Sequence, residues 1–490
     1  MIARCSLALA ALLGLASAVG AQTYTAPGPR GPMAVVGTQP ASVSSAPVTT
    51  TVRVLFDRAV DLASVDAASF RVFGRHSGAA RGAYALIAGG LGVEFTPDDD
   101  FSAGEVVWVN LARTIRGLDG TRLRAAGYAF QFGTEVQPSG GSFTQYAVLS
   151  NNHGEQTRIY GAAGTDLNHD GYPDLTTVNE VSADLRVFLN LADGTGNYGP
   201  FLPPEPIGDE ASPNATADFD NDGDADICAA ASSSEDVWIL LGSGDGSFGP
   251  AQSISVGQEP HGIAALDVDG DADFDIVNCN NASNNLSLML NDGSGVFGPP
   301  SFFDGGVDGE YGLAAGDMDH DGIADLVVAG RDGSHVRTLR GNGNGTFTPA
   351  GAAQGSGGQT WVVTLGDVDG DGDLDASTAN STSGTAGILK NTGTGVFKPV
   401  STVTIGAHTV STDLGDLDGD GDLDWAVSSF GGGFWRFYRN DGSGSFAFWF
   451  HVTAPSNPSC AILLDTDNDG DLDLALTDEI ADVVVLMKNN

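Results

Sequence analysis

The sequence predicts an all-β protein in which a small Ig-like β-sandwich precedes a seven-bladed β-propeller. A nine-residue acidic motif occurs seven times between Asp166 and Asp473, and successive copies begin 52, 49, 50, 50, 49 and 49 residues apart. Short apolar runs and turns surround each copy, so that one repeat accommodates four strands. A period of this length with several strands per unit is typical of a propeller. Alternating strands without the motif come before the repeats and indicate a separate sandwich.

The first 21 residues have the pattern of an export signal. Arg4 supplies the positive start, residues 7–15 form the apolar centre, and Val19-Gly20-Ala21 gives a small-residue cleavage site. The apolar stretch is too short to span a bilayer, and no later segment predicts a transmembrane helix. Residues 22–35 are rich in Pro, Gly and Ala and predict a flexible leader. We therefore expect an exported protein that is secreted, periplasmic or associated with the cell surface.

Residues 36–135 alternate between apolar and polar positions in short runs separated by turns. The runs lie at residues 51–56, 70–73, 92–95 and 106–109, a pattern that predicts a β-sandwich. Residues 56–61, 95–97 and 117–120, the last ahead of residues 128–132, resemble the bacterial Ig-like domain of the S-layer type. The resemblance implies a spacer or an adhesion module.

The acidic motif, D-x-[DN]-x-D-G-x-x-D, predicts a metal-binding loop. Its glycine allows the chain to fold back, so that the side chains at positions 1, 3, 5 and 9 converge. Four such oxygen ligands, completed by the carbonyl of position 7 and by water, suit calcium. An EF-hand would need a glutamate at position 12 and a helix on each side, and the sequence has neither. A single copy is equally compatible with a solvated turn, but seven copies in register argue against that interpretation.

We predict up to seven calcium sites. Two are expected to be the weakest: Asn168 replaces one carboxylate in the first loop, and Ala272 replaces the glycine of the third. The predicted ligands are Asp166, Asn168, Asp170 and Asp174; Asp218, Asp220, Asp222 and Asp226; Asp267, Asp269, Asp271 and Asp275; Asp317, Asp319, Asp321 and Asp325; Asp367, Asp369, Asp371 and Asp375; Asp416, Asp418, Asp420 and Asp424; Asp465, Asp467, Asp469 and Asp473.

Residues 140–490 resemble the FG-GAP/VCBS repeats, whose best-known relatives are the propellers of integrin alpha subunits. The resemblance rests on segments such as 366–375 and 440–446. It implies calcium in a loop between the first and second strands of every blade, on one face of the disc. The last repeat lacks a fourth strand, whereas residues 141–149 match one. We therefore expect those residues to pair with the strand near the C-terminus and close the ring.

The charge of the chain limits its partners. A formal net charge of −42 with 63 acidic residues disfavours nucleic acid, which is itself a polyanion. After removal of the signal, Cys228, Cys279 and Cys460 remain, and their contexts in different repeats predict free, buried thiols. No catalytic triad, zinc motif or phosphate-binding loop is present in the sequence, so we expect no enzymatic activity.

One further set of positions, six residues before the acidic loops, should lie on the face away from calcium. It carries Tyr160, His261, Tyr311 and Trp361. These side chains either pack the channel or form a platform for a ligand. The function we expect is an adhesion or binding module for an extracellular glycan or protein. The alternatives are a polysaccharide lyase or hydrolase acting at the propeller mouth, and a structural component of the envelope. The sequence does not indicate an oligomeric state.

Overall fold

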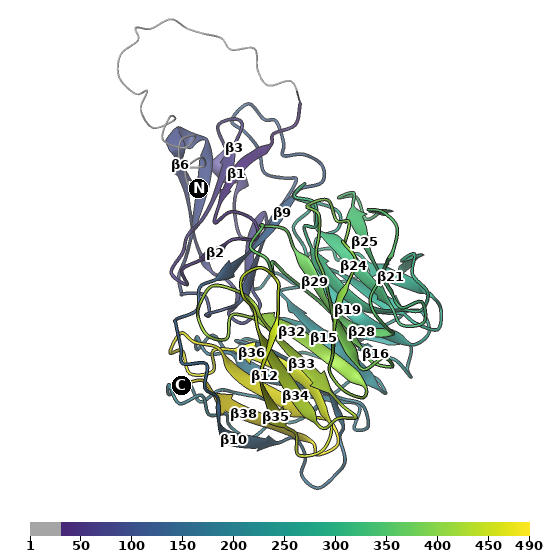
Figure 1. Ribbon diagram of the computed structural model, residues 1–490. Helices are drawn as coiled ribbons and strands as arrows, with labels where there is room; N and C mark the ends of the chain where they lie inside the picture. Colours follow the sequence, from purple (N-terminus) through teal and green to yellow (C-terminus); the bar gives the residue numbers. More distant parts are fainter. Residues whose placement is uncertain (1–30) are drawn as a thin grey trace, which may run out of the picture.

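The computed structural model describes residues 31–490, and the predicted export signal lies outside them. A sandwich, drawn in purple, stands on one face of a ring of sheets (Figure 1). Apart from two short 3-10 helices, Leu62–Ser64 and Ala88–Gly90, the described elements are all strands. The predicted all-β class is confirmed. Within residues 31–490, no helix is long and apolar enough to cross a membrane.

The sandwich consists of two sheets whose inner faces share one apolar core. Strand β3 shows the alternation that the sequence predicts, because Val52, Val54 and Phe56 are buried while the residues between them are partly exposed. One sheet has the order β1 (Val35–Gln39), β3 (Val52–Phe56), β7 (Gly92–Pro97) and β6 (Gly82–Ile87). The other has the order β2 (Ser45–Ala46), β9 (Tyr128–Thr134), β8 (Val106–Leu111), β4 (Phe70–Gly74) and β5 (Gly78–Ala79).

The leader predicted for residues 22–35 extends too far towards the sandwich. Met33 is fully buried in the sandwich core and forms a bridge with Leu123, and strand β1 begins at Val35. Apolar burial therefore outweighs the Pro- and Gly-rich composition of this segment. Residues 22–30 lie outside the described part of the chain.

The repeats form seven antiparallel sheets among the described residues, numbered here by their acidic loops. Sheets 1 to 3 contain β11 (Ile159–Thr165), β12 (Asp174–Asn179), β13 (Asp184–Phe188) and β14 (Glu205–Pro206); β15 (Ala211–Ala217), β16 (Asp226–Ala231), β17 (Asp236–Leu240) and β18 (Gln252–Ser255); β19 (Pro260–Leu266), β20 (Asp275–Asn280), β21 (Asn285–Met289) and β22 (Ser301–Phe303).

Sheets 4 to 7 repeat this order, with one extra short strand beside β25. They contain β23 (Glu310–Gly316), β24 (Asp325–Gly330), β25 (His335–Gly341), β26 (Phe347–Pro349) and β27 (Gln354–Gly355); β28 (Thr360–Gly366), β29 (Asp375–Asn380), β30 (Thr385–Leu389) and β31 (Ser401–Thr404); β32 (Thr409–Gly415), β33 (Asp424–Ser429), β34 (Phe434–Arg439) and β35 (Ala447–Thr453); β36 (Pro458–Leu464), β37 (Asp473–Asp478), β38 (Val483–Lys488) and β10 (Thr144–Ser150).

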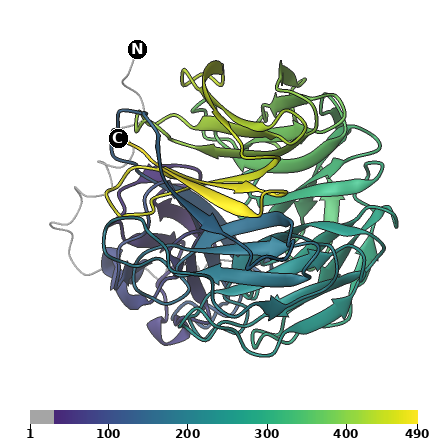
Figure 2. The same cartoon turned by 90° about the horizontal axis from the view of Figure 1, so that it is seen from below.

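The first strands of neighbouring sheets contact one another around a central channel, and β36 contacts β11 to complete the circle (Figure 2). Strand β10 supplies the outer strand of sheet 7 and pairs with β38, from Thr144 opposite Lys488 to Ser150 opposite Val483. The predicted closure by the residues before the first repeat is confirmed. It joins the two ends of the ring and covers the edge of β38.

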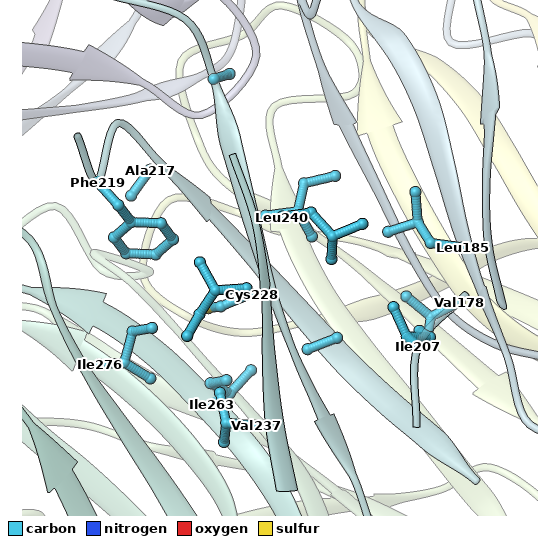
Figure 3. Packing of buried hydrophobic residues seen from close by; sticks show 14 of the residues in the cluster. Val178, Leu185, Ile207, Ala217, Phe219, Cys228, Val237, Leu240, Ile263 and Ile276 are labelled. Carbon is cyan, nitrogen blue, oxygen red and sulfur yellow. The ribbon is translucent and has the colours of Figure 1, made fainter. Parts of the chain in front are cut away.

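The propeller core lies between neighbouring sheets. Every residue of the second strand is buried in all seven sheets, since each such strand is packed between two other layers. Figure 3 shows one interface, where Cys228 of sheet 2 lies among side chains such as Phe219, Ile263 and Ile276. Cys228 and Cys279 are free and buried as predicted, whereas the free Cys460 is only partly buried.

Candidate metal loops and the channel mouth

The acidic loops connect the first strand of each sheet to its second strand, and their carboxylates converge. In at least five loops, three side-chain oxygens lie within 4.8 Å of one another. This spacing lets one cation contact all three, which is the arrangement that hard divalent cations require. The groups are Asp218, Asp220 and Asp226; Asp267, Asp269 and Asp271; Asp317, Asp319 and Asp325; Asp367, Asp369 and Asp371; Asp416, Asp418 and Asp424.

The aspartate at position 1 holds each loop in its curled shape. In the sixth loop, Asp416 Oδ2 accepts a hydrogen bond from the N–H of Gly421 at 2.9 Å, and Gly421 has φ +93°. Ala272 takes the equivalent left-handed conformation in the third loop, with φ +74°. A Cβ is strained there by about 1 kcal/mol, as expected for a non-glycine residue in this conformation.

The aspartate at position 9 has a second role that the sequence did not indicate. In the sixth loop, Asp424 accepts backbone hydrogen bonds from Leu417 at 3.2 Å and from Asn440 at 2.9 Å. Both carboxylate oxygens therefore fasten the loop to the end of the third strand, and the remaining lone pairs stay available for a cation. The same two bonds recur at Asp174, Asp226, Asp275, Asp325, Asp375 and Asp473.

Asparagines after the third strand link neighbouring sheets. Asn440 Nδ2 donates to the carbonyl of Val368 in the preceding acidic loop at 2.8 Å. Asn190, Asn291, Asn391 and Asn489 make the same contact, while Gly242 and Gly341 stand at this position in sheets 2 and 4. The recurrent Asn ahead of the Gly-x-Gly turn is the sequence signal that would have revealed these links.

The acidic loops carry more negative charge than their own surroundings neutralise. The pKa of Asp174, Asp226 and Asp325 is raised to about 8, mainly by burial; backbone N–H groups oppose this shift and nearby carboxylates add to it. Burial likewise raises the pKa of Asp218 and Asp317 to about 6. Carboxylates in this state bind either protons or a cation. Oxygen ligands, their spacing and their charge together fit a divalent metal ion.

Basic side chains offset part of this charge. In sheets 4 to 7 the third strand ends with a cation against position 3 of the loop: Arg340 lies 2.9 Å from Asp319, Lys390 3.1 Å from Asp369, Arg439 2.8 Å from Asp418, and Lys488 contacts Asp467. In sheets 1 to 3 the corresponding residues are Leu189, Leu241 and Leu290.

Arginines of the sandwich contact the acidic loops of sheets 2 and 3. Arg81 lies 2.9 Å from Asp224, and Arg113 lies 3.1 Å from Asp269. The sandwich therefore lies on the acidic-loop face of the propeller. Its arginines contact the loops of two sheets in which the third strand is followed by leucine instead of a basic residue.

His169 and His320, at position 4 of their loops, are exposed to solvent, and each also bridges two loops. His169 Nε2 lies 2.7 Å from Asp224 Oδ1, and His320 Nε2 lies 2.8 Å from Asp373 Oδ1. Both partners stand at position 7 of the next loop. The left-handed conformation of position 4, with φ of +59° and +60°, places the ring beside the neighbouring sheet.

A turn of the sandwich enters the central channel from this face. His76 Nδ1 lies 2.8 Å from the carbonyl of Gly164, and Arg75 Nη2 lies 3.2 Å from Asp413 Oδ2 on an inner strand. Glu105 holds the turn by accepting the backbone N–H groups of His76 and Ser77 at 2.7 and 2.9 Å. The channel is thus entered on the acidic-loop side, and its other mouth faces away from the sandwich.

At that other mouth, the structure contains a cavity of about 610 Å³. It is lined by residues from all seven sheets and includes the four side chains that the sequence singled out. Tyr160, His261, Tyr311 and Trp361 all lie there, so the prediction that they gather on the face away from the acidic loops holds in the structure.

The four rings contact one another, and those from three successive sheets, His261, Tyr311 and Trp361, are neighbours, with the ring centres of Tyr311 and Trp361 5.3 Å apart. His261 stacks on Tyr311 with ring centres 3.6 Å apart, and Tyr160 reaches across the channel to both of them. His261 and Tyr311 are only 4% and 8% exposed. The packing interpretation therefore holds for these two, whereas Tyr160 and Trp361 keep partly exposed surfaces in the cavity.

Two rings of side chains surround the cavity, and sequence reasoning found only part of them. One ring precedes the first strands and contains Arg158, Glu210, Glu259 and His408, all with φ between +51° and +58°. The other follows the second strands and contains Glu180, Arg331, Phe430 and Glu479. Glu180 and Phe430 donate their backbone N–H groups to the carbonyls of Arg158 and His408 in the first ring, at 3.0 and 2.8 Å. Arg331 and Glu479 donate instead to the carbonyls of Gly309 and Asn457, at 2.8 and 2.9 Å. The first ring lies two residues before the aromatic positions, so the same alignment contained it.

Comparison with known proteins agrees with this architecture. A bacterial Ig-like domain matches residues 30–134. FG-GAP-like repeats match residues 166–229, 218–278, 267–328, 317–378 and 416–476, more than half of the chain. No curated protein sequence matches the chain.

Several solved structures are similar to this chain at low identity. BBS1N, solved in complex with ARL6DN, has a TM-score of 0.51 at 13% identity, and the match covers 71% of this chain and 97% of that one. A putative 6-phosphogluconolactonase from Bacteroides uniformis has a TM-score of 0.49 at 12% identity, covering 79% and 98%. An Agrocybe aegerita lectin that recognises terminal N-acetylglucosamine has a TM-score of 0.43 at 21% identity, covering 62% and 83%. By its repeats, its acidic loops and its N-terminal sandwich, the chain belongs to the FG-GAP-like repeat proteins and carries a bacterial Ig-like domain.

Proposed function

We propose that this chain is an exported calcium-binding β-propeller protein that serves as a binding or adhesion module for an extracellular glycan or protein. The observation that carries the proposal is the cavity at the channel mouth, on the face that the sandwich leaves uncovered. Concave sites with aromatic walls and a few placed polar groups are the usual ligand sites of proteins. Variable loops at one end of a rigid scaffold suit recognition.

In this proposal, calcium occupies up to seven acidic loops and neutralises their carboxylates. Asp416, Asp418 and Asp424 would hold it in the sixth loop, and the corresponding residues would hold it in the others. The loops with Asn168 and Ala272 would bind most weakly. The residues themselves act as a scaffold, because they fasten the strands of one sheet to each other and to the next sheet.

Catalysis is not part of the proposal. Glu180 and Glu479, two carboxylates of the cavity, are both engaged by Arg158, at 3.1 Å in the case of Glu180. An acid and a base of a glycosidase need free access to the bond that they cleave. The competing enzyme hypothesis is tested by searching for cleaved products whenever a ligand is found.

The test is a glycan and peptide array probed with the mature protein in calcium. Trp361→Ala should weaken binding of any ligand found by about 2 kcal/mol, the scale of an aromatic hot spot. Phe448→Ala is the matched control, since Phe448 is an aromatic residue 56% exposed on the outer strand β35. Absence of any ligand that depends on Trp361 would contradict the proposed site.

A further inference from the structure

The cavity at the channel mouth has an acidic side and an aromatic side. Glu479, Glu180, Glu210, Glu235 and Glu259 come from sheets 7, 1, 2 and 3, which are consecutive in the ring. The wall from sheets 4, 5 and 6 has no carboxylate and contains the aromatic residues Tyr311, Trp361 and Phe430 together with Arg331, Val362, His408 and Val410. This division is a property of the folded ring, in which sheet 7 lies beside sheet 1.

The two arginines of the cavity are already engaged. Arg158 lies between Glu180, at 3.1 Å, and Glu479. Arg331 stacks on Tyr311 with its guanidinium 4.7 Å from the ring centre. Among residues 31–490, no ion pair involves Glu210 or Glu235, and both side chains are exposed. The acidic side therefore retains negative charge that the protein itself does not neutralise.

The shape of the cavity favours a protruding group over a length of polymer. Residues of all seven sheets surround it, and the stacked rings of His261 and Tyr311 lie within its wall. A ligand enters such a space with an end or a side chain. A flexible side chain that projects from a polypeptide can do so at any position, whereas a sugar chain can do so only at a terminus.

From these observations, and resting on the proposed function, we propose that the cavity binds a lysine or arginine side chain of an extracellular polypeptide. The cationic group would lie towards Glu210 and Glu235, and the aliphatic stem would lie against Trp361 and Tyr160. Organic cations bind well beside aromatic faces, and long cationic side chains combine an apolar stem with a charged tip. The carboxylates select for charge and the rings select for the stem.

The test is isothermal titration of the full mature protein, in calcium, with a capped pentapeptide of one lysine flanked by glycines. We expect a Kd of about 1 mM or tighter for this peptide, and binding about tenfold weaker or worse for its norleucine analogue. The double variant Glu210→Gln, Glu235→Gln should lose about tenfold in affinity for the lysine peptide and most of its salt dependence. Glu205→Gln, on the outer strand of sheet 1, should change neither property.

The other possible results distinguish the proposed binding function from the proposed preference for a cationic side chain. Equal binding of the norleucine peptide would overturn the role of charge, and binding of a glucosamine trimer without the lysine peptide would overturn the polypeptide source. A neutral or anionic ligand that is lost on Trp361→Ala but kept by the double variant would leave the binding function standing and refute this inference. If no ligand depends on Trp361, both proposals fail. Melting curves in calcium that match the unaltered protein confirm that each variant is folded.

Discussion

Removal of calcium should destabilise the propeller much more at pH 8 than at pH 5.5. In the absence of metal, burial raises the pKa of Asp226 from 3.8 to about 8, so the folded state favours the protonated carboxyl. A raised folded pKa contributes stability that is complete below 3.8 and is lost as the pH rises through 8. Calcium bound to the carboxylate removes this dependence, because the ion favours the charged form. The difference in stability between the calcium-bound and the calcium-free protein therefore grows with pH.

The size of the effect follows from the buried carboxylates. For each pH unit between the unfolded and folded pKa values, a carboxyl group contributes about 1.4 kcal/mol less to the stability of the calcium-free protein. The contributions of Asp174, Asp226 and Asp325 should therefore each fall by about 3 kcal/mol between about pH 5.5 and 7.5. Calcium at about 1 mM adds roughly 0.4 to 1.4 kcal/mol per loop by mass action, for a Kd of about 10⁻⁴ to 10⁻³ M. Since whole domains are stable by about 5 to 15 kcal/mol, we expect melting to fall by on the order of 10–20 °C in chelator near pH 8.

Differential scanning calorimetry gives the melting temperature in calcium, in excess EGTA and in magnesium at both pH values. Magnesium should restore little stability, because it demands a smaller and stricter octahedral shell. Asp226→Asn should reduce the pH dependence in chelator, since the amide cannot ionise. The reasoning is refuted if calcium and chelator give the same difference in melting temperature at both pH values.

Three further predictions concern the ring and its mouth. Deletion of residues 140–150 should cause aggregation or loss of cooperative unfolding, because β38 loses its partner strand; a shortened chain that melts like the intact protein in calorimetry would contradict this. Asn440→Ala should lower the free energy of unfolding, measured with chemical denaturant, by about 1–3 kcal/mol, because the buried carbonyl of Val368 loses its hydrogen-bond donor. Asn342 is exposed, so Asn342→Ala should lower it by less than about 0.5 kcal/mol, and equal effects would refute the link between sheets. Burial lowers the pKa of His261 to about 3, so the stability that its neutral form contributes is present above about pH 6.5 and is lost as the pH falls. The difference in unfolding free energy between the unaltered protein and His261→Gln should therefore drop by about 2 kcal/mol from about pH 6.5 to about pH 5. A constant difference would show that the ring is not buried.

Much of the fold could be read from local patterns. The run at residues 51–56 became β3 because alternation along a strand directly reports which face is buried. The missing fourth strand of the last repeat and the spare one at residues 141–149 predicted the closing pair, since a repeat architecture supplies a template for each unit. Met33 was misassigned because its burial depends on a partner, Leu123, that lies far along the chain.

The sequence by itself determined the repeats, the acidic loops and the ring closure, because each is written in residues that lie close together or recur at a fixed period. Only the tertiary structure decided that the sandwich docks on the acidic loops, where Arg113 of one domain meets Asp269 of the other across more than a hundred residues. It also decided that Tyr160 crosses the channel to His261, so that the aromatic positions pack together. Such contacts depend on the curvature of the closed ring, to which every sheet contributes and which no local pattern records.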